Sequence, residues 1–445
     1  MNQFSQDKKA KELVLTTPDF KSMIRITFWN GLGFIFFSFI KSYVVIYFFG
    51  GSGVDLGIIM ALQPLARLFS MPIIAYLTDH TSKKRLVLIG SLGRTIAYFL
   101  YWSSLVVSNI YMFGTGVFLQ GLIVGFFWPP FFSLISEKSD KNRRTEALAK
   151  GRGKMIGYGF LLGAIISIPI FTLVSLFLPE NVPLLYSPLL LFAMINLIAG
   201  FQFYYKIDED LTFEKYWDSL NKSEIKQYNI DNGNTKLESN NKMKNGSTRM
   251  FFISFSIFIF AILITSVIGT IFSPFISAYL IENLLSGISV ILIPIIVMIV
   301  YFPAQVISQL LASKIGKIYD RISPTISVIM IGIFRAIITL LLILTLSPID
   351  FAIVLIFLYI VLESNNYFIQ AIMSRISIKH RGKVFGLHMW IDQFGRVIGP
   401  LIGGILWDNL GYDAPFMFAI FIGIGLIPVL VFSIRELSPN MVELL

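Results

Sequence analysis

Twelve long apolar stretches dominate this chain of 445 residues. Each is long enough to cross a bilayer as a helix, since a transmembrane helix needs about 20 mostly apolar residues. Only 14% of the residues are charged, whereas a soluble domain has roughly 25%. We therefore predict an all-α membrane protein with twelve transmembrane helices, over residues 26–49, 55–78, 86–107, 110–135, 155–178, 183–205, 250–277, 285–311, 325–347, 351–374, 384–407 and 414–434.

Positive charge is confined to one set of loops. Lysine and arginine follow the even-numbered spans, whereas the loops after the odd-numbered spans carry only acids, such as Asp55, Glu282 and Asp408. This distribution is typical of a membrane protein whose basic loops face the cytoplasm. It predicts a multi-pass protein of the cell membrane with both termini in the cytoplasm. It also accounts for the net charge of +10 without a nucleic-acid partner.

The chain also contains signs of an internal duplication. Asp79 and Arg94 lie fifteen residues apart, and Asp320 and Arg335 repeat this spacing 241 residues later. A polar segment divides the spans into six and six, which indicates two related halves. We predict a cytoplasmic N-terminal tail, a first six-helix bundle, a cytoplasmic linker, a second six-helix bundle and a cytoplasmic C-terminal tail. Their boundaries are residues 1–24, 25–205, 206–249, 250–435 and 436–445.

Several kinds of chemistry are not expected. The chain has no cysteine and only three histidines, which argues against disulfides and a metal centre. It lacks a GxxxxGK[ST] loop, so direct use of ATP is unsupported. The short loops contain no catalytic constellation. We expect neither a cofactor nor enzymatic activity.

The loop after the second span carries a recognisable motif. It reads Ala75-Tyr-Leu-Thr-Asp79-His80-Thr-Ser82-Lys83-Lys84-Arg85, and a partial second copy reads Gly316-Lys-Ile-Tyr-Asp320-Arg321. The loop resembles the signature of the major facilitator superfamily, although Ala75, Ser82 and His80 replace two glycines and a basic residue. The resemblance implies two pseudo-symmetric six-helix bundles and a cytoplasmic gate. The implied gate residues are Asp79, Lys83, Lys84, Arg85, Gly316, Asp320 and Arg321.

The eleventh span contains a second element of the resemblance. Its small residues recur at four-residue spacing, in a pattern that this family uses in its fifth and eleventh helices. Small residues at this spacing let helices approach closely in lipid. We assign to helix packing Gly395, Gly399, Pro400, Gly403 and Gly404.

Ionisable and polar side chains inside the spans are the candidate functional residues. Placing a charge at the centre of a membrane helix costs about 2.5–3.5 kcal/mol, so such residues usually face a water-filled cavity or a partner. Glu363 and Asp392 are candidates for proton coupling, although Asp392 and Arg396 also have the spacing of an in-helix ion pair. Arg94 and Arg335 are expected to play structural roles, with their stems reaching towards the basic face. The candidates for the substrate cavity are Asn30, Lys41, Gln63, Arg67, Asn366 and Arg396.

These features favour a secondary active transporter that moves a small organic solute by alternating access and is coupled to protons. Its partners would be the solute, protons or another coupling ion, and the lipid bilayer, and we expect a monomer. The excess of cavity cations is a weak indication of an anionic or polar solute. A facilitative uniporter and a drug or metabolite exporter of the same fold remain alternatives. Outside transport, the alternatives are a membrane sensor or receptor and a membrane-embedded transferase.

Overall fold

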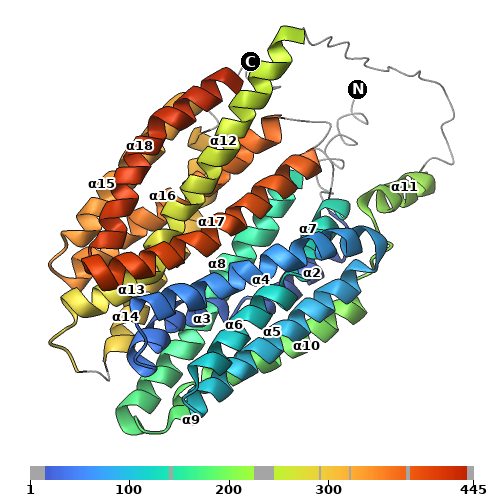
Figure 1. Cartoon of the computed structure of the whole chain (residues 1–445). Coiled ribbons are helices and arrows are strands. Elements are labelled where there is room, and N and C mark those ends of the chain that lie inside the picture. The colour runs from blue at the N-terminus through green and yellow to red at the C-terminus, as the bar shows by residue number, and fades with distance from the viewer. Residues whose placement is uncertain are drawn as a thin grey trace, which may run out of the picture.

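The computed structural model describes residues 16–139, 144–224, 245–289, 292–319, 322–376 and 381–437. Over these residues the chain is almost entirely helical, and its one isolated β-bridge pairs Thr16 with Ser139. The helices, labelled as in Figure 1, are α2 Phe20–Asn30, α3 Phe34–Tyr43, η1 Val44–Phe48, α4 Gly53–His80, α5 Lys83–Val106, α6 Ile110–Val124, α7 Trp128–Glu137, α8 Arg144–Phe177, α9 Val182–Leu185, α10 Ser187–Lys206, α11 Phe213–Glu224, α12 Asn245–Ile271, η4 Ser273–Phe275, α13 Ile276–Tyr279, η5 Leu280–Leu284, α14 Ile293–Tyr319, α15 Pro324–Ile343, α16 Pro348–Ile376, α17 Arg381–Leu410 and α18 Ala414–Leu437.

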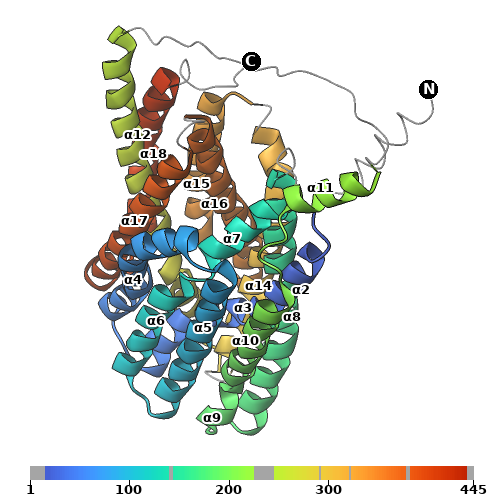
Figure 2. The same ribbon diagram turned by 90° about the vertical axis from the view of Figure 1, so that its right-hand side faces the viewer.

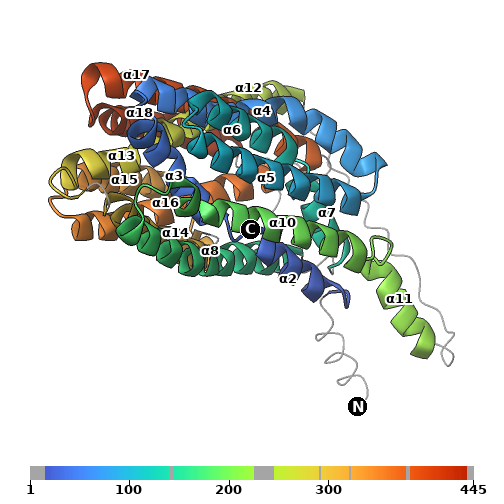
Figure 3. The same ribbon diagram turned by 90° about the horizontal axis from the view of Figure 1, so that it is seen from below.

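The long helices form two groups that lie side by side, one from each half of the chain (Figure 1). Helices α4 and α17 pack against each other across the boundary between the groups (Figure 2). Helices α8 and α14 make a second contact across it (Figure 3). The protein is therefore an all-α membrane protein with two helical bundles, as the sequence predicts.

Nine helical segments within the described residues are long and apolar enough to cross a membrane. The other three predicted spans coincide with α2 and α3, with the shorter apolar stretch Ile293–Ser308 of α14, and with α17. The first of these is interrupted, and α17 carries several charged residues along its length. The count of twelve remains a prediction for these three segments.

Three spans are interrupted where glycine or proline weakens a helix. The first breaks over residues 31–33, at two glycines. The fourth breaks between α6 and α7 just before Pro129 and Pro130, which have no backbone N–H to donate. The seventh breaks at Pro274. The apolar pattern of the sequence predicts a continuous span at each of these places, and this prediction is wrong.

The first and seventh spans share an unusual ending. The first span ends in the π-helical turn η1, and the seventh ends in the π-helical turn η5. Such turns are rare and are often found at functional sites. Their presence at corresponding places is consistent with the duplication inferred from Asp79 and Arg94.

The glycines of α17 lie at close helix contacts. An added Cβ at Gly395 would lie 2.5 Å from Ser266 Cβ of α12, and Gly399 and Gly403 also face α12. Gly404 instead faces the backbone of Gly53 in α4. Pro400 does not interrupt α17, and its carbonyl lies against Gly57 of α4. The contacts of α17 with both bundles therefore need small residues.

The segment between the bundles begins with the short helix α11, in which the rings of Phe213 and Trp217 stack. Residues 225–244 lie outside the described part of the chain, as do most of the N-terminal tail and the end of the C-terminal tail. The exact boundaries of the two bundles remain predictions.

Candidate functional site

A cavity with a volume of about 470 Å³ lies between the two bundles. Helices α4 and α7 line it from the first half, and α12, α15, α16 and α17 line it from the second. A volume of this size suits a small organic molecule. Its wall combines apolar and aromatic side chains with ionisable ones, including Arg67, Arg335, Glu363, Asp392 and Arg396.

The structure brings most of the predicted ionisable residues together. Arg67 reaches the cavity from the middle of α4, and Glu363 from the middle of α16. Asp392 and Arg396 line it from α17, and the predicted cavity residue Asn366 lines it from α16. Sequence spacing alone does not reveal that α4, α16 and α17 share one cavity.

Asp392 and Arg396 of α17 form the ion pair that their four-residue spacing allows. Arg396 Nε donates to Asp392 Oδ2 at 2.7 Å, and Ser266 Oγ donates to Asp392 Oδ1 at 2.8 Å. The carboxylate of Asp392 is therefore held by a cation and a hydroxyl group. Glu363 interacts electrostatically with Arg396 and with Tyr359.

Three predicted cavity residues lie elsewhere. The side chain of Lys41 donates to Gln63 Oε1 at 3.3 Å, and neither residue lines this cavity. Asn30 is 1% exposed and is enclosed beside α5, where Ser91 Oγ donates to its Oδ1. The assignment of Asn30 to the cavity is therefore wrong, because α2 turns this face towards its own bundle.

The expectation that Arg94 reaches towards the basic face is also wrong, and for Arg335 it stays a prediction. Arg94 is completely buried, and its Nη1 donates to the carbonyl oxygen of Asn30 at 2.9 Å and to Asn196 Oδ1 at 3.3 Å. Its guanidinium group lies over the rings of Phe34 and Phe127. Arg335 is 7% exposed and lines the cavity. Sequence reasoning placed both arginines at the periphery and so missed the cavity position of Arg335.

The loops divide the molecule into two ends. The acidic end carries Asp55, Glu282 and Asp408, and the basic end carries Lys83 and Arg85. At the acidic end, Asp408 of α17 accepts hydrogen bonds from the backbone N–H groups of Gly53 and Val54, each at 2.8 Å. These N–H groups have no partner within α4, because they belong to its first turn. Asp408 therefore caps a helix of the other bundle.

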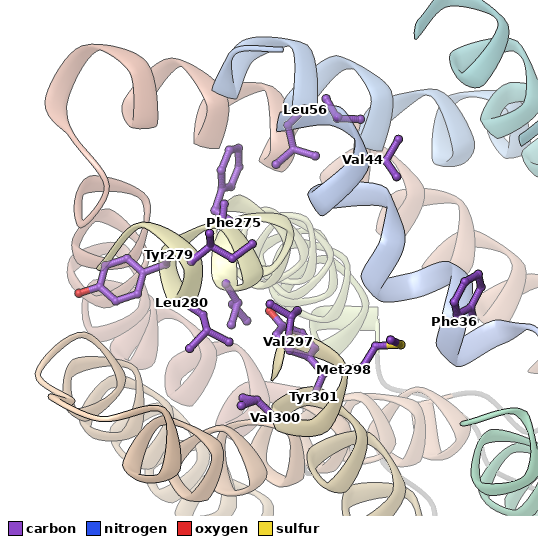
Figure 4. Close-up of a cluster of buried hydrophobic side chains, with 14 of the residues drawn as sticks. Phe36, Val44, Leu56, Phe275, Tyr279, Leu280, Val297, Met298, Val300 and Tyr301 are labelled. Carbon is purple, nitrogen blue, oxygen red and sulfur yellow. The ribbon is translucent and has the colours of Figure 1, made fainter. Parts of the chain in front are cut away.

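The two π-helical turns also meet at the acidic end. Tyr47 in η1 donates to Glu282 Oε1 in η5 at 2.8 Å, and Ser42 donates to the carbonyl of Pro274 at 2.8 Å. An apolar cluster lies beside them, in which Phe36, Val44 and Leu56 of the first half join side chains of the second half, among them Phe275, Leu280 and Met298 (Figure 4). Polar and apolar contacts thus join the two halves at this end.

The predicted gate residues at the basic end make different contacts. Lys83 Nζ lies 3.1 Å from Glu137 Oε1 in the first bundle, and its backbone N–H donates at 2.6 Å to Glu209, at the start of the linker. Lys84 lies over the ring of Tyr204, and Arg85 is exposed. Asp79 is exposed, and it makes no recorded hydrogen bond or ion pair with a described residue. Gly316 lies in α14, whereas Asp320 and Arg321 fall outside the described residues.

Comparison with known proteins identifies relatives of this architecture. A sequence profile described as Major Facilitator Superfamily matches residues 24–367 and 258–443, nearly the whole chain between them. A search of curated protein sequences gives no match.

Solved transporter structures resemble the chain in fold. The nucleoside transporter NupG has a TM-score of 0.63 at 14% identity, covering 95% of this chain and 99% of that chain. A bacterial homologue of the human lysosomal transporter Spinster, inward-facing and unoccupied, has a TM-score of 0.64 at 14% identity, with 97% and 100% covered. A POT family transporter in complex with 5-aminolevulinic acid has a TM-score of 0.67 at 14% identity, with 94% and 96% covered. At these identities the likeness shows the fold alone.

Proposed function

Because the chain belongs to the Major Facilitator Superfamily and is a multi-pass membrane transporter, we propose that it moves a small organic solute by alternating access, driven by protons. The observation that carries this proposal is a cavity that both bundles line, with ionisable groups on its wall, together with the hydrogen bonds that join the bundles at the acidic end. Rocking of one bundle against the other about such a site would expose it to each side in turn.

The acidic end faces outward in this proposal, since the basic loops mark the cytoplasmic side. Asp408, Tyr47 and Glu282 then hold the outer side closed. In the opposite state these hydrogen bonds break, and Asp79 takes up the corresponding role at the cytoplasmic side. A contact that forms in only one of two states biases the equilibrium between them by its own free energy.

Glu363 is the proposed proton carrier. It lies in mid-membrane on the cavity wall, where a carboxyl group can take a proton from one side and release it on the other. Asp392 is less suited to this role, because Arg396 and Ser266 already hold its carboxylate. The ion pair of Asp392 and Arg396 instead stabilises the wall of α17.

Purified protein in sealed vesicles tests the proposal. Vesicles containing the protein should take up or release a labelled solute from a metabolite panel, and an imposed pH gradient should drive accumulation above equilibrium. Flux that is unaffected by the pH gradient would refute proton coupling and favour a uniporter. Absence of flux for a solute that binds the cavity would refute transport itself.

A further inference from the structure

Arg94 and Arg335 occupy corresponding positions of the two halves, and their surroundings differ. Arg94 has two oxygen acceptors and two aromatic rings around its buried guanidinium group. Such contacts compensate in part for removing a charge from water, while Nε and Nη2 of Arg94 have no hydrogen-bond partner among the described residues. Arg335 is also buried, with 7% of its surface exposed, yet it makes no recorded hydrogen bond or ion pair with a described residue.

The duplication explains this difference residue by residue. Pro188 and Pro415 each stand second in the last helix of their half, and counting eight residues onward pairs Asn196 with Gly423. Arg335 does contact Gly423, since an added Cβ there would lie 2.9 Å from Arg335 Nη2. The second half thus lacks the amide oxygen that Arg94 uses.

A second alignment gives the same result. Tyr43 and Tyr279 each precede the π-helical turn of their half, and counting back from them pairs Asn30 with Ser266 and Phe34 with Thr270. Smaller side chains therefore replace two further neighbours of Arg94. Ser266 and Thr270 both line the cavity. This part of the second half thus carries smaller side chains than its counterpart in the first, and Arg335 lines the cavity.

A second arginine faces the same cavity from the other bundle. Arg67 of α4 lines it, and no hydrogen bond from its guanidinium group to a described side chain is recorded. Arg396 is also present, but Asp392 pairs with it. Keeping a cation away from water is costly unless an opposite charge or hydrogen-bond acceptors meet it, and a bound anion would supply both.

We infer that Arg335 binds the carboxylate or phosphate head of a small organic anion, that Arg67 adds positive charge to the same cavity, and that this anion is the transported solute. A guanidinium group presents paired N–H donors that match both kinds of head group. Trp128, Phe132 and Tyr359 on the cavity wall supply contacts for an apolar or aromatic body. That this anion is transported rests on the proposed function, whereas its binding site is argued from the contacts of Arg335 alone.

Thermal stability of the purified full-length protein tests the binding site without any flux measurement. The probes are inorganic phosphate, phenyl phosphate and phenylacetate, with phenylacetamide as the neutral counterpart. A ligand that binds the folded state stabilises it by RT ln(1 + [L]/Kd), so the Tm keeps rising with the logarithm of the ligand concentration above the Kd. We expect at least one anion to raise the Tm in this concentration-dependent manner and the amide to have no such effect.

Two variants on different helices assign the effect to Arg335. Arg335→Gln removes the charge. Gly423→Asn leaves Arg335 in place and supplies the amide that Asn196 provides in the first half. The new amide should accept a hydrogen bond from Arg335 and so compete with the anion. Each should weaken anion binding by about 10- to 100-fold, the usual effect of losing a hydrogen bond to a charged group. Gly425→Asn is the matched control, because an added Cβ there meets no atom within 4 Å.

The outcomes separate the inference from the proposed function. Equal anion affinity in the parent, Arg335→Gln and Gly423→Asn would overturn the inference, as would equal stabilisation by the amide or none by any of the three anions. Saturable anion binding that Gly423→Asn weakens and Gly425→Asn preserves would support it. If such an anion bound but did not cross vesicle membranes, the site would stand and the transport proposal would fail. Flux of neutral solutes combined with no anion binding would do the reverse.

Discussion

Replacing Asp408 with alanine should open the acidic end. The carboxylate accepts hydrogen bonds from the N–H groups of Gly53 and Val54 at 2.8 Å, and both are lost in the variant. Hydrogen bonds to a buried charge contribute about 1.5–3 kcal/mol each. Asp408 is exposed, so the scale for a helix cap applies, about 1–2 kcal/mol in total.

This free energy acts on the equilibrium between the two states, because the contact joins the bundles. A loss of about 1–2 kcal/mol should change the population ratio by about 5- to 30-fold in favour of the state that is open at the acidic end. The parent chain contains no cysteine, so spin labels can be attached at two introduced cysteines alone. Ile58 and Ile405 are suitable sites, being exposed on α4 and α17 near this end.

Pulsed spin-label distance measurements give the two populations directly. The Asp408→Ala variant should gain a longer distance between the labels, and Asp350→Ala should not. Asp350 is a matched control, because it bonds to Ser347 within its own helix start and joins no bundles. An unchanged distance distribution in Asp408→Ala, or an equal change in Asp350→Ala, would refute the argument that the cap holds this end closed.

Further predictions concern the cavity, the basic end and the buried arginine. Glu363→Gln should abolish pH-driven accumulation in vesicles but leave counterflow exchange measurable, and accumulation equal to that of the parent would remove Glu363 from the coupling role. Asp79→Asn should weaken the contact that Asp79 is proposed to make in the outward-open state. Under conditions that favour that state, single introduced cysteines at the basic end should therefore react faster with a thiol reagent. Equal reactivity of the variant and the parent in every condition would contradict gating by Asp79. Asn196→Leu leaves Arg94 without one of its two oxygen acceptors and should lower the free energy of unfolding by about 1–3 kcal/mol. The purified variant should therefore have a lower Tm than the parent. An unchanged Tm would show that this hydrogen bond contributes little.

The fold was accessible from the sequence because it depends on local properties. The length of each apolar stretch predicts a span, and the motif around Asp79 indicates the superfamily that the comparison confirms. The breaks at residues 31–33 and before Pro129 were not predicted. They depend on how neighbouring helices compensate for the lost hydrogen bonds, and a single span does not carry this information.

The candidate site was predicted less completely. Arg67, Glu363 and Asp392 stand out in the sequence as charges in mid-membrane, and they line the cavity. Arg94 and Arg335 have the same spacing from their motifs, so the sequence treats them alike. Their difference arises from Asn196 and Gly423, which lie far from the arginines in the sequence but on helices that pack directly against them, and it becomes visible only when the packing of α10 and α18 is known.

The central claim is that one cavity is exposed to each side of the membrane in turn. A single cysteine in place of Met71, on the cavity wall of α4, tests it most directly. In sealed vesicles with oriented protein, a membrane-impermeant maleimide should label this cysteine when added from either side, and a bound solute should slow both reactions. Labelling from one side only, under every condition that permits transport, would contradict the account.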